Sequence, residues 1–295
     1  MMTQALYRLI ILLLKGIAVW PLTWLYVLSD ACYLLAYHVF RYRRRMVRSN
    51  LRKAFPQWSE ADIRKTERAF YRHLTDLVFE TVKMLHMSDR EWKQRVEVVG
   101  TELVERAASQ GRPVFLFLGH YGNWEWGQEV TVRYEQPAQS GEIYKPLRNK
   151  VFDRVMQRIR SCFPHNVMIP RSQAVRTILN MKREMPSFLI GFIADQRPTR
   201  DNLYHWTTFL GIDTPYLVGG EKIGRRVDAC FYYLDVEKPA RGHYRYTIRE
   251  MHPVEEAGEA FPYSVAYMRM MEQTIRREPA YWLWSHHRWK HQRTN

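Results

Sequence analysis

Few of the residue patterns that identify common enzyme classes occur in this chain of 295 residues. It has no Gly-x-Ser-x-Gly elbow, no Walker A loop and no Gly-x-Gly-x-x-Gly, which disfavours serine hydrolases of that type, P-loop NTPases and Rossmann oxidoreductases. Its three cysteines lie far apart without a Cys-x-x-Cys pair, so neither a disulfide framework nor a thiolate metal site is indicated. His287 and His291 have the spacing of metal ligands on a helix, but arginines and lysines surround them. We therefore expect no metal and no other cofactor.

Acidic residues are scarce relative to basic ones. The chain has 45 Lys and Arg against 30 Asp and Glu, a formal net charge of +15. The excess is concentrated in residues 41–48, which contain five arginines, and in residues 144–183, which contain ten basic residues against one acid. Such a charge calls for an anionic partner: nucleic acid, a membrane surface, a phosphorylated substrate or an acidic protein.

The N-terminal part of the chain is mostly apolar and aromatic. Residues 16–40 form a long run that is interrupted mainly by Pro21 and Asp30, and its length suffices to cross a bilayer core of about 30 Å. The arginines at 41–45 then resemble a cytoplasmic stop signal. We expect residues 1–45 to form a membrane anchor with a basic flank and residues 46–295 to form the catalytic domain. A buried helical pair in a soluble protein is the alternative.

The remainder of the chain alternates between strand and helix patterns. This alternation predicts an α/β fold with a mostly parallel central sheet flanked by helices. The expected helices cover residues 60–86, 172–185, 216–226 and 262–277, and the expected strands cover 114–118, 143–144, 167–169, 188–194, 230–236 and 244–249.

A histidine follows the most strongly apolar of these strands. Val114–Leu118 reads as a buried central strand, and His120 would emerge at its carboxyl end, where open α/β sheets hold their ligands. Glu125 falls in the first turn of the next expected helix, for which Asn123 is a suitable cap. This geometry offers a His–Glu dyad, in which the carboxylate orients the imidazole and makes it more basic. The alternative is a histidine with a purely structural role.

A general base that is not paired with a nucleophilic side chain of the protein is suited to activate the hydroxyl of an acceptor molecule for group transfer. His120 would deprotonate the acceptor alcohol, and attack on a thioester would build an oxyanion that needs nearby donors. Lys145, Arg148, Arg158 and Arg160 qualify by charge, although a helix over residues 151–161 would also expose arginines without any role in chemistry.

Several short motifs together resemble the bacterial lipid A biosynthesis acyltransferases, a family that includes related phosphatidylinositol mannoside acyltransferases. In chain order these motifs are Arg48-Ser-Asn-Leu-Arg-Lys-Ala-Phe-Pro56, Gly119-His-Tyr-Gly-Asn-Trp-Glu125, Tyr144-Lys-Pro146, Ala194-Asp-Gln196, Phe209-Leu-Gly211 and Tyr281-Trp-Leu-Trp-Ser-His-His-Arg-Trp-Lys290. The sequence departs from the family pattern at Lys145, where arginine is common, and at Gln196, where many members have histidine.

The resemblance implies an inner-membrane enzyme with a glycerolphosphate-acyltransferase-like fold and a catalytic domain facing the cytoplasm. It would transfer an acyl chain from acyl carrier protein, or less often acyl-CoA, to a hydroxyl of a lipid A precursor, without a cofactor or nucleic acid. The implied catalytic residues are His120, Glu125 and Arg160, and the residues expected to contact substrate are Asn123, Tyr144, Lys145, Arg148, Asp195 and Gln196.

Two other functions remain open from the residues alone. The enzyme could acylate another acceptor, such as a phosphatidylinositol mannoside, an aminolipid or a glycerol phosphate. The chain could also be a basic, membrane-tethered binding protein without enzymatic activity. The C-terminal Trp282, Trp284 and Trp289 suit either a bilayer interface or the protein core.

Overall fold

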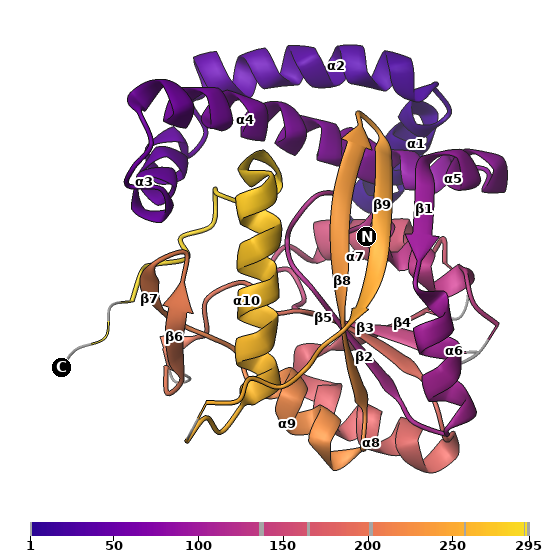
Figure 1. The fold of residues 1–295 in the computed structure, drawn as a ribbon. Coiled ribbons are helices and arrows are strands. Elements are labelled where there is room, and N and C mark those ends of the chain that lie inside the picture. Colours follow the sequence, from indigo (N-terminus) through magenta and orange to yellow (C-terminus); the bar gives the residue numbers. More distant parts are fainter. Residues whose placement is uncertain are drawn as a thin grey trace.

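A computed structural model of the protein describes residues 2–135, 139–163, 166–200, 203–256, 258–291 and 293. Its centre is a seven-stranded sheet with the strand order β1-β9-β8-β2-β5-β3-β4 (Figure 1). The strands are β1 (Val96–Val99), β2 (Val114–Leu118), β3 (Ser140–Tyr144), β4 (Asn166–Pro170), β5 (Leu189–Ile193), β8 (Cys230–Ala240) and β9 (His243–Glu250).

The prediction of a mostly parallel sheet is confirmed. Strands β8, β2, β5, β3 and β4 run parallel to one another, whereas β9 runs antiparallel to β8 and β1 runs parallel to β9. The reversal at β9 follows from its connection to β8, which is only the dipeptide Arg241-Gly242. So short a link can join only antiparallel strands, and Gly242 adopts the positive φ of 71° that such a turn favours. A separate hairpin of β6 (Trp206–Phe209) and β7 (Ile212–Pro215) was not predicted.

Helices flank this sheet, and those predicted over residues 60–86, 172–185, 216–226 and 262–277 are present. The α-helices are α1 (Met2–Ala18), α2 (Leu22–Leu34), α3 (Arg44–Ala54), α4 (Glu60–Lys83), α5 (Asp89–Arg95), α6 (Thr101–Ser109), α7 (Lys150–Arg160), α8 (Ala174–Glu184), α9 (Gly219–Arg226) and α10 (Pro262–Arg277). Shorter turns of 3₁₀ or π-helix cover η1 (Leu35–Val39), η2 (Met84–His86), η3 (Trp126–Val132), η4 (Arg171–Gln173) and η6 (Pro279–Tyr281). Helix α4 begins with a capping box between Ser59 and Asp62, which explains its sharp start.

The apolar N-terminal residues form two helices that meet at a sharp bend. Helices α1 and α2 are separated at residues 19–21, because Pro21 cannot continue a helix and disfavours helical geometry in the residue before it. Among the described residues, no single helix has the length and apolar character of a membrane span; only Gln4–Ala18 and Leu22–Val39 taken together, bent by 116°, meet that test. The expected single membrane segment is therefore not confirmed.

The N-terminal helices pack onto the rest of the protein. Figure 1 shows α2 and α4 lying across the end of the β8–β9 hairpin. Arg241, at the turn of that hairpin, forms ion pairs of 2.7 Å with Asp30 of α2 and of 2.6 Å with Asp76 of α4. Apolar residues from Ile11 to Trp289 form one continuous buried cluster, so the N-terminal helices share the core of the sheet domain.

The C-terminal tryptophans belong to that core. Trp282, Trp284 and Trp289 are each at most 5% exposed, which corrects the alternative that placed them at a bilayer interface. Asn50, from the Arg48–Pro56 motif, holds this segment by donating 2.8 Å hydrogen bonds to the carbonyls of Trp284 and His286. Two motifs that are more than 200 residues apart in the sequence thus make one packed unit.

Candidate active site

His120 and Asp195 meet at the same edge of the sheet. They follow the parallel neighbours β2 and β5, whose last paired residues are Leu118 and Ile193. His120 lies two residues after Leu118, and Asp195 lies two residues after Ile193. A Cβ at Gly119 would overlap the Met271 thioether of α10, so a larger residue here would have to displace that side chain. Parallel pairing therefore brings together two residues that are 75 positions apart in the sequence.

A buried carboxylate orients the imidazole. The Oδ1 atom of Asp195 lies 2.7 Å from His120 Nδ1, and its Oδ2 atom accepts hydrogen bonds from the His120 amide at 3.1 Å and from Trp282 Nε1 at 2.7 Å. Burial acts to raise the pKa of Asp195, but His120 and these hydrogen bonds together hold that pKa below its ordinary value. Because the ionised carboxylate can only accept, Nδ1 carries the proton and Nε2 presents a lone pair to the cavity.

The carboxylate beside His120 is therefore not Glu125, which corrects the predicted His–Glu pairing. Both Glu125 oxygens accept hydrogen bonds from Arg160, each at 2.7 Å. The chain after His120 does not enter a helix directly: Tyr121 forms a bridge with Trp282, and Gly122 has a φ of 58°. The intervening turn carries Glu125 into a separate ion pair.

Arg160 also faces a second carboxyl group. Its Nε atom lies 3.7 Å from Oε1 of Glu142, on β3. Burial raises the pKa of Glu142 to about 7, with a smaller opposing effect of Arg160 and a further increase from Glu125. Burial acts to lower the pKa of Arg160, but the hydrogen bond and charge of Glu125 outweigh it, and that pKa is raised. Arg160 is thus a cation that lies between Glu125 and Glu142, a carboxyl group whose pKa is raised by burial.

We expect removal of one partner of the Glu125–Arg160 ion pair to lower the stability of the protein strongly. With Glu125 only 7% exposed and Arg160 19%, Glu125→Gln should lower the free energy of unfolding by about 3–5 kcal/mol, because a largely buried guanidinium loses its hydrogen-bonded counter-charge and keeps only Glu142 at 3.7 Å. Denaturant unfolding in detergent measures this. Glu60→Gln, which removes an exposed partner of Arg52, is the matched control and should change stability little. Wild-type stability of Glu125→Gln would contradict a structural ion pair.

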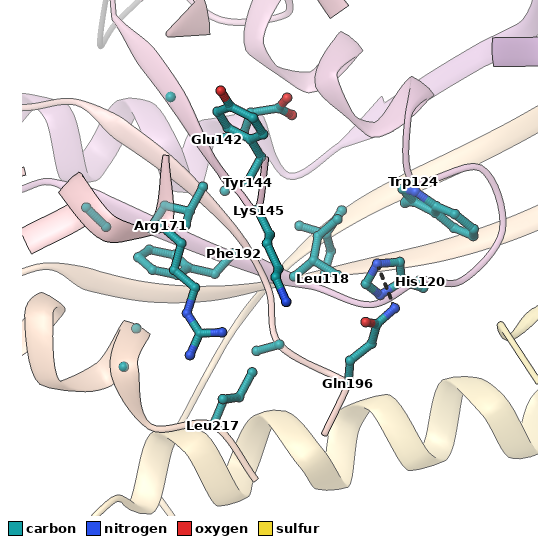
Figure 2. A pocket seen from close by; sticks show the side chains of 18 of the residues that line it. Leu118, His120, Trp124, Glu142, Tyr144, Lys145, Arg171, Phe192, Gln196 and Leu217 are labelled. Atoms are coloured by element: carbon teal, nitrogen blue, oxygen red, sulfur yellow. Dashed lines mark hydrogen bonds between the residues drawn. The ribbon is translucent and has the colours of Figure 1, made fainter. Parts of the chain in front are cut away.

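A cavity of about 1550 Å³ opens beside His120. Ligand pockets commonly measure about 300–1,000 Å³, so this one has room for a large ligand or for two ligands. Part of its lining is apolar, namely Leu116, Leu118, Val130, Met156, Met168, Leu189, Phe192, Ile193, Leu217, Val218 and Ile223. Another part is cationic, namely Lys145, Arg148, Arg160, Arg171, Arg197, Arg200, Lys222 and Lys290. Figure 2 shows His120 and Gln196 on one side of this space and Arg171 and Phe192 on the other.

The other predicted substrate contacts divide into two groups. Tyr144, Lys145, Arg148 and Gln196 line the cavity, as expected. Asn123 does not: it is fully buried, donates to Glu80 Oε2 at 2.8 Å and accepts from the Trp126 amide at 3.0 Å. Asn123 therefore fixes the turn after His120 and is not placed to touch substrate.

Several functional positions were missed by sequence reasoning. The residues that line the cavity but were not singled out from the sequence are Glu142, Arg171, Arg197, Arg200, Lys222, His286 and Lys290. The available signals were that Arg171, Arg197 and Arg200 follow strands β4 and β5 and that His286 and Lys290 belong to the C-terminal motif. Conversely, Arg158, a candidate oxyanion donor, is exposed and donates a hydrogen bond to Ser161, so it does not belong to the site. Within the described parts of the chain, no group of three His, Cys, Asp or Glu side chains could hold a metal ion.

The sequence matches one protein family over nearly its whole length, the bacterial lipid A biosynthesis acyltransferases, across residues 1–291. Over 254 residues it is 26% identical to the lipid A biosynthesis palmitoleoyltransferase of Escherichia coli, covering 84% of this chain and 79% of that protein. The lipid A biosynthesis acyltransferase of Shigella flexneri has the same identity and coverage. That of Haemophilus influenzae is 22% identical over 147 residues, 50% of this chain and 45% of its own length. The chain therefore belongs to the bacterial lipid A biosynthesis acyltransferase family, which confirms the resemblance found in its motifs.

Proposed function

We propose that this acyltransferase moves a fatty acyl chain from the thioester of acyl carrier protein to a hydroxyl of a lipid A precursor. The observation that carries this proposal is the orientation of His120. Its Nδ1 is held by a buried carboxylate, and its Nε2 faces a cavity with both apolar and cationic walls. A general base in such a place suits an alcohol acceptor, an acyl chain and an anionic group at once.

The proposed reaction uses His120 first as a base and then as an acid. Nε2 takes the proton of the acceptor hydroxyl while that oxygen attacks the thioester carbonyl carbon. The imidazolium formed in this step is stabilised by Asp195, which is ionised and in contact with Nδ1. Collapse of the tetrahedral intermediate breaks the C–S bond, and the thiolate leaves with the proton from His120. The products are an ester and the free thiol.

The cationic lining supports anionic substrates. Arg160 is paired with Glu125 and Glu142, but the other cationic residues of the lining form no ion pair with a carboxylate among the described residues: Lys145, Arg148, Arg171, Arg197, Arg200, Lys222 and Lys290. Phosphates of a lipid A precursor carry the complementary charge, as does an acidic carrier protein at the cavity mouth. The apolar lining residues provide a wall for the acyl chain. We propose that Arg160 and Glu125 stabilise the cavity wall and do not act at the reacting atoms, because they form an ion pair with each other.

The outward faces of the N-terminal helices support attachment to the inner membrane. Leu12, Trp24 and Phe40 are 69%, 63% and 74% exposed, and several other large apolar side chains of α1, α2 and η1 are about half exposed. Exposed large apolar side chains gathered on neighbouring helices in this number mark a membrane or protein contact. In the proposed arrangement residues 1–45 rest in the membrane, and residues 46–295 lie on its cytoplasmic side.

The membrane contact predicts a specific change in partition. Replacing Leu12, Trp24 and Phe40 together by serine should lower binding to anionic phospholipid vesicles more than tenfold, since burial of each side chain contributes about 1–3 kcal/mol. Co-sedimentation with vesicles measures the partition. Val99→Ser changes an exposed apolar side chain on β1 and should leave it unchanged. Equal sedimentation of the triple variant and the wild type would remove the proposed membrane surface.

The function itself is tested by acyl transfer in detergent. Purified protein is mixed with acyl-loaded carrier protein and a lipid A precursor, and mass spectrometry should find the precursor heavier by one acyl chain. Parallel reactions contain acyl-CoA as donor, or a phosphatidylinositol mannoside or glycerol phosphate as acceptor. Transfer only to another acceptor would overturn the lipid A assignment, and preference for acyl-CoA would overturn the donor.

A further inference from the structure

The catalytic nitrogen of His120 is already occupied in the structure. The side-chain amide nitrogen of Gln196 lies 3.2 Å from His120 Nε2 (Figure 2). Because Nδ1 carries the ring proton and donates a hydrogen bond to Asp195, the neutral imidazole has only a lone pair at Nε2. Its partner must then be a donor, so the amide N–H of Gln196, and not its carbonyl, faces the ring. In this state the base cannot accept a proton from any hydroxyl.

We propose that Gln196 covers the base in the resting enzyme and, once the acceptor hydroxyl displaces it, donates its amide N–H to the thioester carbonyl oxygen. This inference rests on the proposed acyl transfer. It gives the reaction an oxyanion donor that lies within hydrogen-bond distance of the base. It also keeps the base covered until an acceptor arrives.

The surroundings of Gln196 allow this change of partner. The preceding residue, Asp195, is fixed by three hydrogen bonds, so the backbone at the site is anchored. The Gln196 side chain itself is partly exposed, lines the cavity, and makes no other hydrogen bond to the residues that the structure describes. A short rotation of a side chain held by one hydrogen bond is therefore all that the exchange needs.

The exchange fits the balance of the reaction. The acceptor oxygen replaces the amide at Nε2 and gives up its proton there, and the new O–C bond forms as the carbonyl π pair moves onto oxygen. That oxyanion accepts the freed amide N–H of Gln196. When the carbonyl reforms, the C–S bond breaks, the thiolate takes the proton from the imidazolium, and the amide returns to Nε2. Gln196 acts only as a hydrogen-bond donor and neither gains nor loses a proton.

The decisive variant is Gln196→Met, which keeps the size of the side chain and removes its donor. We expect kcat for transfer to fall by about 10²–10³-fold, the effect of losing one oxyanion donor. The KM for the acceptor should stay equal or fall, because no amide has to be displaced. Gln196→His, which restores an N–H donor, should recover part of kcat. Gln110→Met, on the exposed end of α6, controls for the substitution itself.

A second measurement needs no substrate. Diethyl pyrocarbonate acylates the unprotonated nitrogen of histidine. In Gln196→Met, which lacks the covering amide, His120 should therefore be modified roughly fivefold faster than in the wild type, because an ordinary hydrogen bond contributes about 1 kcal/mol. Peptide mass spectrometry follows His120, with the exposed His86 as internal reference.

The outcomes separate the two claims. Wild-type kcat in Gln196→Met, or a loss of kcat with an equal rise in KM, would overturn the donor role. Unchanged modification of His120 would overturn the resting hydrogen bond. Absence of transfer by the wild-type protein to any acceptor would instead overturn the proposed function, and the modification experiment would still decide whether Gln196 covers the base.

Discussion

Replacement of His120 by alanine should reduce acyl transfer by at least 10²–10⁴-fold, the usual contribution of a positioned general base. The reason is geometric: Nε2 of His120 is the basic atom that faces the cavity, while its other nitrogen is held by Asp195. Without it the acceptor hydroxyl must attack while still protonated. Steady-state transfer from acyl-loaded carrier protein to a lipid A precursor, followed by mass spectrometry, measures the loss.

The same variant should keep its fold and its membrane binding. His120 is at the edge of the cavity with 21% of its side chain exposed, so its removal creates no large void in the core. His86→Ala, on the exposed turn η2, provides a matched histidine substitution outside the cavity. Transfer by His120→Ala at a rate close to that of His86→Ala would show that another group acts as the base.

Substitution of Asp195 by asparagine should also have a large effect, about 10⁴-fold on kcat by analogy with other histidine–carboxylate pairs. An asparagine would present an amide N–H to Nδ1 and favour the tautomer with its proton on Nε2. The atom that faces the cavity would then be a donor and no longer a base. Because Asp195 also accepts from Trp282 and from the His120 amide, the variant tests the whole buried arrangement.

The control for Asp195→Asn is Asp228→Asn, which changes an exposed carboxylate paired with Arg112. It should transfer acyl chains at the wild-type rate. A further check is the NMR spectrum of the His120 ring nitrogens, which distinguishes the two tautomers directly. An Asp195→Asn protein that retains both the wild-type tautomer and the wild-type rate would remove Asp195 from the mechanism.

Local patterns in the sequence predicted the main elements of the catalytic domain. The unbroken apolar run Val114–Leu118 predicted a central strand because only a strand covered on both faces is apolar at every position, and all five residues are buried. The helical pattern over residues 262–277 predicted α10, which covers Pro262–Arg277. The place of His120 after that strand predicted its position at the ligand-binding edge. Each of these inferences depends on residues close together in the sequence.

The partners of the charged groups depended on the tertiary structure. The sequence offers Glu125 five residues after His120, but parallel pairing of β2 and β5 brings Asp195 to the imidazole, and helix α7 brings Arg160 to Glu125. The N-terminal apolar run likewise reads as one segment until Pro21 divides it into two helices bent by 116°. By itself, the sequence determined the family and the positions of the main strands and helices, and it predicted His120 as the base. Only the tertiary structure decided which carboxylate serves that base, because contacts between strand ends depend on sheet order and register, which no local pattern encodes.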